Sequence, residues 1–319
     1  MNKNKLYQRK ILVTGGSGFI GSCLAEKLAR DSENLVIVVD NLLTGDQEKV
    51  PASEHLNLKF IKADVNDFRE ISSIFHAYSF NYVFHYAAVV GVRRTQTFPV
   101  MVLNDITGIK NILNLSKNTG VERVYYSSSS EVYGEPVEYP QNEHTTPLNS
   151  RIPYAIVKNV GEAYMRSYKK EFDLNYTIFR FFNTYGPRQS TDFVMSKFIA
   201  SAMKNEDIPI YGDGSQTRTF CYIDDNIEAC TNAFYNNLVV NDVANIGNDT
   251  ETSVLELAKM VIRITGSRSK IVHLPPLKEG DMTRRKPDVT KMKELLKREL
   301  TPLEEGIRKI ISNPRYILG

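Results

Sequence analysis

The stretch Lys10-Ile11-Leu12-Val13-Thr14-Gly15-Gly16-Ser17-Gly18-Phe19-Ile20-Gly21 decides the fold. An apolar run is followed by a glycine-rich turn and then by apolar residues at helical spacing, which predicts a strand, a tight turn and a helix. Gly15 permits the turn, Gly18 lets the backbone approach a phosphate, and Gly21 lets the helix pack close to the strand. Because N–H groups at the start of a helix attract anions, this order predicts a binding site for a dinucleotide pyrophosphate.

A second apolar run, Leu35-Val36-Ile37-Val38-Val39, ends in Asp40. An acid about 20 residues after the glycines is placed to accept hydrogen bonds from the ribose hydroxyls of the adenosine. Its negative charge would repel a 2′-phosphate, and none of the next three residues is an arginine. The sequence therefore predicts NAD, rather than NADP, as the cofactor.

The composition is that of an ordinary globular protein. The chain has 319 residues, of which 42% are hydrophobic and 24% are charged, and its formal net charge is +3. No apolar stretch approaches the roughly 18 residues of a membrane-spanning helix, and no block of basic residues predicts nucleic-acid binding. The polar start of the chain does not look like a secretory signal, and three cysteines without C-x-x-C spacing predict neither a disulfide framework nor a zinc site. We therefore expect a cytoplasmic protein that binds no metal, nucleic acid or membrane.

Short apolar runs alternate with helical segments from residue 10 to about residue 182. The expected strands are 10–13, 35–39, 58–62, 82–86, 123–127 and 176–182, and the expected helices are 18–30, 67–78, 98–118 and 154–171. Such alternation predicts an α/β fold, with a doubly wound parallel sheet of the Rossmann type and helices on both faces. Ligands of such sheets bind beyond the carboxyl ends of the strands.

The pattern changes after Asn183, where turn-rich segments such as Tyr211-Gly212-Asp213-Gly214-Ser215 appear. Further helices are expected near 193–204, 224–236, 253–265 and 303–312. We therefore expect an NAD-binding domain over residues 1–183 and a smaller, mixed, substrate-binding lobe over residues 184–319. Some segments of this lobe are expected to return to the sheet.

Two further motifs supply chemistry. Tyr154 and Lys158 lie four residues apart and therefore on one face of the expected helix. A nearby ammonium and a cationic nicotinamide both favour the phenolate form of a tyrosine, which makes Tyr154 a candidate general base. The run Ser127-Ser128-Ser129-Ser130 lies at the end of the fifth expected strand. A hydroxyl there, such as that of Ser129, can bridge a substrate hydroxyl and Tyr154.

Together these motifs resemble the extended short-chain dehydrogenase/reductase family, the NAD-dependent nucleotide-sugar epimerases, dehydratases and decarboxylases. The resemblance rests on the glycine turn, the serine run, the Tyr154 and Lys158 pair, and Arg180-Phe181-Phe182-Asn183-Thr184-Tyr185-Gly186-Pro187-Arg188. It extends to Gly212-Asp213-Gly214-Ser215-Gln216-Thr217-Arg218 and Arg285-Lys286-Pro287-Asp288, and covers nearly the whole chain.

The resemblance implies a shared first step, in which Tyr154 removes the proton of a sugar hydroxyl, usually at C4, and the C4 hydride goes to NAD⁺. The residues expected in catalysis are Tyr154, Lys158, Ser129, Ser130 and Glu131. Those expected to contact the cofactor are Gly15, Gly18, Phe19, Ile20, Gly21, Asp40, Asn41, Asp64, Val65, Ala87, Ala88, Asn104, Ser127, Tyr154 and Lys158. Those expected to bind a nucleotide-diphosphate sugar are Asn183, Arg188, Arg218, Arg285 and Arg93, although Arg93 fits an exposed loop equally well. The family also implies a homodimer, formed through the helices at 98–118 and 154–171.

The fate of the 4-keto sugar depends on a few residues. A 4,6-dehydratase typically carries Asp-Glu after a Thr, where this chain has Ser129-Ser130-Glu131, so dehydration is disfavoured. Ser130-Glu131 and Arg285 match the UDP-glucuronate decarboxylases, whereas Pro153-Tyr154-Ala155 looks more like the 4-epimerases. We therefore expect a 4-epimerase, with decarboxylation as the main competing reaction. A 4-dehydrogenase that releases the keto sugar, and a non-catalytic protein that senses NAD(H), are also compatible with the fold.

Overall fold

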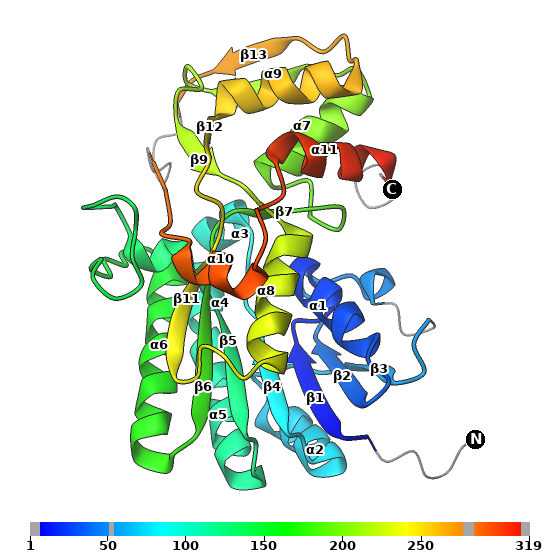
Figure 1. Ribbon diagram of the computed structural model, residues 1–319, viewed down its shortest axis with the longest axis vertical. Coiled ribbons are helices and arrows are strands. Elements are labelled where there is room, and N and C mark those ends of the chain that lie inside the picture. The colour runs from blue at the N-terminus through cyan, green and yellow to red at the C-terminus, as the bar shows by residue number, and fades with distance from the viewer. Residues whose placement is uncertain (1–6, 51–53, 277–283, 314–319) are drawn as a thin grey trace. The chain divides into compact units, whose positions relative to one another are not determined.

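The computed structural model describes residues 7–50, 54–276 and 284–313 of the chain. Its main sheet has seven strands in the order β11-β6-β5-β4-β1-β2-β3 (Figure 1). These strands are β1 (Arg9–Thr14), β2 (Asn34–Asp40), β3 (Leu58–Lys62), β4 (Tyr82–His85), β5 (Arg123–Ser129), β6 (Asn175–Phe181) and β11 (Asp242–Ile246). Strand β1 pairs in parallel with β2 and β4, as do β2 with β3 and β4 with β5. The predicted doubly wound sheet is confirmed, and its strand order reverses at β1, where such sheets bind ligands.

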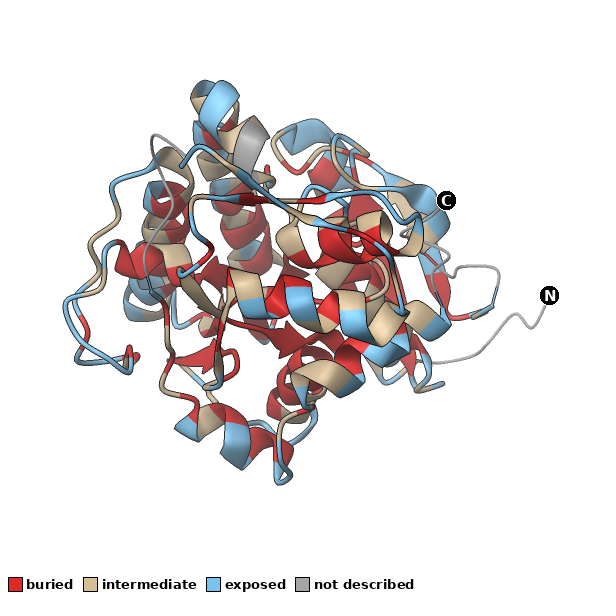
Figure 2. Cartoon of the chain, turned by 90° about the horizontal axis from the view of Figure 1, so that it is seen from above, coloured by how far each residue is buried: buried red, intermediate tan, exposed pale blue. Residues whose placement is uncertain are grey.

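Helices cover both faces of this sheet. They are α1 (Phe19–Ala29), α2 (Phe68–Tyr78), α3 (Val92–Thr97), α4 (Pro99–Leu103), α5 (Asp105–Thr119), α6 (Pro153–Phe172) and α8 (Ile223–Tyr235). On one face, Leu12 and Val83 pack in a core cluster with residues of α2, α5 and α6. On the other face, Phe84 and Tyr125 stack at 4.3 Å between ring centroids, and both meet Phe234 of α8 edge-on. Because both faces are covered, β2 and β5 are buried along their length, whereas the edge strand β3 is only partly buried (Figure 2).

The chain divides into two compact units. The first comprises residues 1–134, 148–180 and 230–244, and the second comprises residues 135–147, 181–229 and 245–319. The first unit contains β1 to β5 and the helices α1 to α6. Strand β11 comes after the segments 135–147 and 181–229 of the second unit in the sequence, and it joins the main sheet beside β6.

The second unit is built from short strand pairs and helices. Its remaining elements are β7 (Thr184–Tyr185), α7 (Val194–Met203), β8 (Ile208–Tyr211), β9 (Thr217–Thr219), β10 (Cys221–Tyr222), β12 (Glu251–Ser253), α9 (Val254–Thr265), β13 (Ile271–Leu274), α10 (Thr290–Leu296) and α11 (Leu303–Ser312). Strand β8 pairs in parallel with β13, and β9 pairs in antiparallel with β12. Helix α9 starts with a capping box, in which Ser253 and Glu256 satisfy each other's backbone N–H groups, and it packs against α7 and α11.

The predicted single helix over residues 98–118 is wrong, because this segment forms two helices, α4 and α5. Pro99 lacks an N–H group and opens α4, and Asn104 separates it from α5. The carboxylate of Asp105, at the start of α5, accepts a 2.7 Å hydrogen bond from the Val89 N–H group. This bond ties the new helix to the loop after β4. The sequence also did not predict α3, α10, β11 or the short 3₁₀ helices η1 (Gln47–Lys49) and η2 (Ser130–Tyr133). It predicted none of the short strands of the second unit, which are β7, β8, β9, β10, β12 and β13.

Candidate active site

The residues predicted for catalysis and for cofactor binding all belong to the first unit and gather at the carboxyl ends of its strands or in the helices that follow. The turn between β1 and α1, with the first residues of that helix, contains Gly15, Gly18, Phe19, Ile20 and Gly21. The ends of the next three strands and the residues after them contribute Asp40, Asn41, Asp64, Val65, Ala87 and Ala88, and the junction of α4 and α5 contributes Asn104. The end of β5 contributes Ser127 and Ser129, η2 contributes Ser130 and Glu131, and α6 contributes Tyr154 and Lys158.

The glycine turn leaves no space for side chains. Gly15 has a φ of +69°, and a Cβ atom there would lie 2.6 Å from the backbone nitrogen of Ala87. A Cβ atom on Gly21 would lie 2.2 Å from the carbonyl oxygen of Gly15. Gly18 is the N-cap of α1, and no side chain caps this helix. The turn is therefore pressed against the end of β4, and the start of α1 is left without a side chain that would compete with an anion.

Asp40 orders the glycine turn as well as ending β2. Its carboxylate accepts hydrogen bonds from the backbone N–H groups of Ser17 at 3.0 Å and Leu42 at 2.8 Å. The side chain is buried, and burial raises the pKa of Asp40, while the two hydrogen bonds oppose that shift. Carboxylate oxygens can each accept more than one hydrogen bond, so ribose hydroxyls can still bind here.

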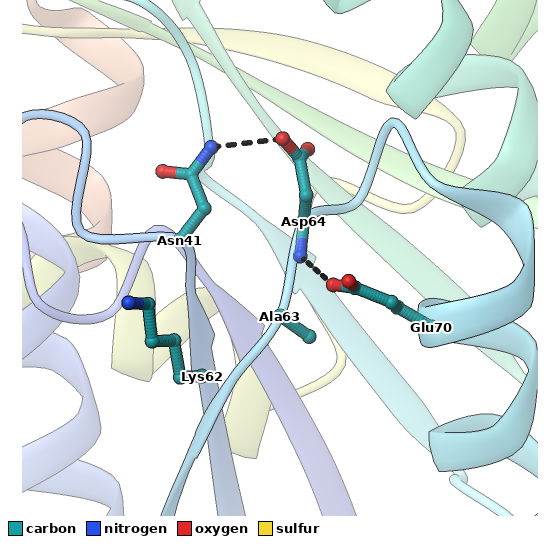
Figure 3. Close-up of a pocket in the computed structure, with 5 residues that line it drawn as sticks. All are labelled: Asn41, Lys62, Ala63, Asp64 and Glu70. Atoms are coloured by element: carbon teal, nitrogen blue, oxygen red, sulfur yellow. Dashed lines mark hydrogen bonds between the residues drawn. The ribbon is translucent and has the colours of Figure 1, made fainter.

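A pocket of about 260 Å³ opens beside Asp40, at the ends of β2 and β3 (Figure 3). It is lined by Asn41, Lys62, Ala63, Asp64 and Glu70. The Asn41 amide donates to the Asp64 carboxylate at 3.1 Å, and Glu70 accepts a 2.7 Å hydrogen bond from the Asp64 N–H group. The pocket therefore lies where the sequence predicts the adenosine half of the cofactor, with its polar groups already ordered by one another.

The segment after β3 is fixed by α5. Gly108 donates its N–H to the Asn66 side chain at 2.8 Å, and the Asn111 amide donates to the carbonyl oxygen of Val65 at 2.9 Å. A Cβ atom on Gly108 would lie 2.9 Å from a methyl group of Val65. Only glycine at position 108 therefore allows this segment to dock so closely on α5.

The end of β1 is joined to the end of β4 by a buried hydrogen bond. Thr14 Oγ1 and His85 Nδ1 lie 2.8 Å apart, and Thr14 Oγ1 also accepts from the Ala87 N–H at 3.2 Å. Burial, helped by the charge of Lys158, lowers the pKa of His85 to about 3. His85 is therefore neutral at physiological pH and serves as a fixed hydrogen-bonding group behind the glycine turn.

Lys158 is buried beneath Tyr154 on α6. Its Nζ donates to the carbonyl oxygen of Ser127 at 2.6 Å and to Ser127 Oγ at 3.2 Å, and lies 5.8 Å from the centre of the Tyr154 ring. Burial lowers the pKa of Lys158 to about 8, while Asp105 acts in the opposite direction. At pH 7 this lysine is therefore mostly cationic, and it lies close enough to favour a phenolate at Tyr154.

The serine run is buried and each of its first three residues has a separate contact. Ser127 Oγ accepts a hydrogen bond from Lys158, and Ser128 Oγ donates to Glu162 at 2.7 Å. Ser129 Oγ accepts from the Glu131 N–H at 3.2 Å. The last contact makes Ser129 the N-cap of η2, which places Glu131 in the first turn. The roles of Ser129, Ser130 and Glu131 in catalysis stay predictions.

A buried ion pair lies under this strand end, and the sequence did not predict it. Glu162, one helical turn after Lys158, is bound in bidentate fashion by Arg180 of β6 at 2.8 and 2.7 Å. The Arg180 guanidinium also donates to the hydroxyl of Tyr133 at 2.8 Å. These hydrogen bonds hold the pKa of Glu162 below its usual range despite burial. A lone arginine inside the apolar run of β6 was the signal that could have revealed this pair.

The residues predicted to bind the substrate lie mainly in the second unit. Asn183, Arg188, Arg218 and Arg285 all belong to it. Asn183 has a φ of +31°, and its Nδ2 is buried without a hydrogen-bond partner among the described residues. Such a donor is suited to a ligand oxygen. Arg285 is buried, whereas Arg188 and Arg218 are half-buried. Arg93 lies on α3 in the first unit, and its side chain is outside the described part of the structure.

Other kinds of site are absent from the part of the chain that the structure describes. No group of three or more His, Cys, Asp or Glu side chains there could hold a metal ion. None of the helices described is long and apolar enough to cross a membrane. Cys23, Cys221 and Cys230 are all thiols.

Residues 11–247 match the model of the NAD dependent epimerase/dehydratase family. The chain belongs to this family. The match begins in β1 and ends just after β11, so it covers nearly all of the main sheet and every residue predicted for catalysis and cofactor binding.

Members of the family with different activities are similar to this chain. UDP-glucuronic acid decarboxylase 1 of Danio rerio is 36% identical over 95% of this chain and 72% of its own length. The UDP-glucose 4-epimerase of Thermotoga maritima, crystallised with UDP-glucose, is 35% identical, with a TM-score of 0.89 over 95% of this chain and 97% of the epimerase. The UDP-glucuronic acid 4-epimerase of Bacillus cereus, in complex with UDP-glucuronic acid and NAD, is 29% identical, with a TM-score of 0.85 over 97% of this chain and 98% of its own.

The family confirms the predicted cofactor, NAD, and the class of enzyme, which acts on nucleotide sugars. The first unit fits NAD on its own geometry. The turn at Gly15 and Gly21 has no room for a Cβ atom, α1 starts without a side-chain cap, and the pocket at Asn41 and Asp64 lies beside Asp40. Gly15, Gly18 and Gly21 would hold the pyrophosphate, and Asp40 the ribose.

Proposed function

We propose that this enzyme oxidises the C4 hydroxyl of a nucleotide-diphosphate sugar and returns the hydrogen to the opposite face of C4, which makes it a 4-epimerase. The observation that carries the proposal is the buried Lys158, hydrogen-bonded to Ser127 and placed under the ring of Tyr154. This arrangement supplies a cation that stabilises a phenolate at the end of β5. When bound, NAD supplies the hydride acceptor.

The residues of the first unit divide the proton chemistry among them. Tyr154 takes the proton of the C4 hydroxyl as a general base, and later returns it. Ser129 holds the same hydroxyl by a hydrogen bond and is itself oriented by the Glu131 N–H group. Lys158 keeps the phenolate accessible near neutral pH, because its ammonium is fixed by Ser127 rather than by solvent.

The residues of the second unit bind the rest of the substrate in this proposal. Arg188, Arg218 and Arg285 hold the diphosphate, since guanidinium groups match phosphate oxygens in bidentate geometry. Asn183 supplies its unsatisfied Nδ2 to an oxygen of the sugar or phosphate. The solved T. maritima structure, which contains UDP-glucose, supports a uridine nucleotide as the first substrate to test.

Decarboxylation of a UDP-linked uronic acid is the second candidate, and specific observations favour it. Glu131 lies in the first turn after β5, where it can protonate the enolate left by carbon dioxide, and Arg285 can meet a carboxylate. The identity to the D. rerio decarboxylase is as high as that to the T. maritima epimerase. The segment Pro153-Tyr154-Ala155, which looks more like the 4-epimerases, supports epimerisation instead.

The two outcomes are separated by following all six carbons of the sugar. UDP-glucose and UDP-glucuronate labelled at C6 are incubated with the enzyme, and products are read by NMR and by trapped carbon dioxide. We expect the C4 epimer with every carbon retained. Tyr154→Phe should lower turnover by about 10²–10⁴-fold, and Glu131→Gln by less. Release of labelled carbon dioxide from UDP-glucuronate by the unchanged enzyme, and its absence in Glu131→Gln, would show that the enzyme is a decarboxylase and not an epimerase.

We also propose a cytoplasmic homodimer. Phe98, Val100 and Leu103 on or beside α4 and Ile156 on α6 are exposed apolar residues, and α4 and α6 are in contact. A second copy of the chain would cover this surface, because contiguous exposed apolar side chains commonly mark a protein–protein interface. Sedimentation of Val100→Asp beside the unchanged protein tests this, with a monomer as the expected state of the variant.

A further inference from the structure

The carboxylate of Glu251, in the second unit, contacts two of the three consecutive cationic residues Arg284, Arg285 and Lys286. It accepts two hydrogen bonds of 2.6 Å from Arg284, one to each oxygen, and lies 3.8 Å from the ammonium of Lys286. The Arg284 guanidinium also stacks 4.5 Å above the ring of Tyr139. The residue between the two, Arg285, is only 7% exposed, whereas the side chains of Arg284 and Lys286 are 45% and 35% exposed.

The backbone of this run is fixed and extended at its end. The backbone N–H of Gln141 donates to the carbonyl oxygen of Lys286 at 2.8 Å, and the backbone N–H of Asp288 donates to the carbonyl oxygen of Gln141 at 2.8 Å. These two bonds form a parallel bridge between Gln141 and Pro287. In an extended chain, successive side chains alternate between two sides. Arg284 and Lys286 contact Glu251 and are partly exposed, whereas Arg285 between them is buried, which is the contrast that such alternation produces.

The same carboxylate is connected to the strand that carries Arg218. Glu251 begins β12, where it lies opposite Thr219 of β9, and the next pair in the register is Thr252 with Arg218. The hydroxyl of Thr217 donates to Glu251 at 3.2 Å. The hydrogen bonds from Arg284 lower the pKa of Glu251, so the group is a carboxylate throughout the physiological range. One side chain thus joins the segments of two predicted phosphate-binding arginines.

We propose that Glu251 is a positioning residue for diphosphate recognition. By drawing Arg284 and Lys286 to itself, it makes Arg285 the cation of this run that meets the diphosphate, and through β12 it fixes β9 with Arg218. This inference rests on the proposed nucleotide-sugar substrate and adds a reason why one arginine of an Arg-Arg-Lys run is selected. A lysine-like point charge would not be held so well, because the bidentate contact with Arg284 also fixes direction.

The test compares the binding of UDP and UMP to the full-length protein by calorimetry. In Glu251→Gln, Arg284 and Lys286 lose the carboxylate that they share. Their side chains can then compete with Arg285 for the diphosphate and hold it in the wrong position. We expect the Kd for UDP to rise about tenfold, the value of one charge-assisted hydrogen bond, and the Kd for UMP to change by less than about twofold. The KM for the nucleotide sugar should rise with the Kd for UDP, while kcat stays unchanged.

Two variants complete the experiment. Arg284→Lys keeps a cation beside Glu251 and should bind UDP more tightly than Glu251→Gln. Glu304→Gln breaks another bidentate carboxylate–arginine contact of the second unit, that with Arg263, and should bind UDP as the unchanged protein does. Equal losses for UDP and UMP, or none for UDP, would overturn the role of Glu251. If the unchanged protein binds neither nucleotide, the proposed substrate itself is wrong, and this inference fails with it.

Discussion

The pairs Arg180–Glu162 and Arg284–Glu251 have the same geometry in opposite surroundings. Arg180 binds Glu162 in the first unit through Nε and Nη2 at 2.8 and 2.7 Å, and Arg284 binds Glu251 in the second through the same two atoms at 2.6 Å each. The side chains of the first pair are 1% and 0% exposed, whereas those of the second are 45% and 20% exposed.

These two settings let one kind of contact serve two purposes. Removing one partner of a buried pair leaves a charge without water, so the first pair is tied to the stability of the fold. Exposed pairs contribute little to stability because water and salt screen them, so the second pair can act on the direction of side chains without being needed for folding. The buried His85 and Lys158, whose pKa values are strongly shifted, also belong to the first unit.

The largest effect is expected from Arg180→Met. The variant leaves the Glu162 carboxylate buried, with hydrogen bonds from Ser128 and from the partly exposed Arg166. We expect a loss of about 3–5 kcal/mol in the free energy of unfolding, measured with urea. Combining it with Glu162→Gln removes the unpaired charge and should restore part of the loss. A single variant as stable as the unchanged protein would show that burial does not distinguish the two pairs.

A second effect is expected from acid, and it should act on the first unit. The pKa of His85 is about 3 in the folded chain, against an ordinary value of 6.5. Between these values the unfolded chain binds a proton that the folded chain does not, so stability falls as the pH is lowered from 6.5. From pH 6.5 to 4.5 this amounts to about 2–3 kcal/mol. His85→Asn should lose that part of the pH dependence; an unchanged slope in this variant would assign the acid sensitivity to other groups.

The smallest effect is expected for the stability of Glu251→Gln. Because its pair with Arg284 is largely exposed, the thermal midpoint should match that of the unchanged protein at low and at high salt. Glu304→Gln, which affects another exposed pair, is the control and should behave alike. A drop in midpoint comparable with that of Arg180→Met would make the Glu251 contact a structural element of the fold and remove the contrast between the two pairs.

The sequence predicted the parts of the fold that repeat. Each of the six expected strands has a counterpart in the main sheet, because central strands such as β2 are covered on both faces and read as continuous apolar runs. Strand β11 was missed since it contains Asp242 and Asn245, which break such a run. In the structure, the N–H group of Asn245 donates to Glu143 and its amide to the carbonyl oxygen of Gln141, both at 2.9 Å, so its polarity is satisfied by a segment about 100 residues away.

Residues of the candidate site could be predicted from the sequence where their type and spacing alone indicate a role. Tyr154 and Lys158 are four residues apart on a helix, and the glycines have their own steric signature. Glu162 was not predicted, because a glutamate on a helix resembles an exposed residue until its partner on another strand is known. The fate of the keto sugar was not predicted either, since Glu131 is compatible with more than one outcome and its effect depends on where the substrate lies.

The double duty of Asp40 limits what protein engineering can do with this enzyme. Replacing an acid at the end of the second strand is the obvious way to admit NADP, yet this carboxylate also holds the N–H groups of Ser17 and Leu42. A neutral or basic replacement would loosen the very loop that must receive the pyrophosphate. On the role predicted for Asp40 at the ribose, cofactor preference and loop order are coupled, and we expect a successful switch to need a second substitution that restores an acceptor for Ser17.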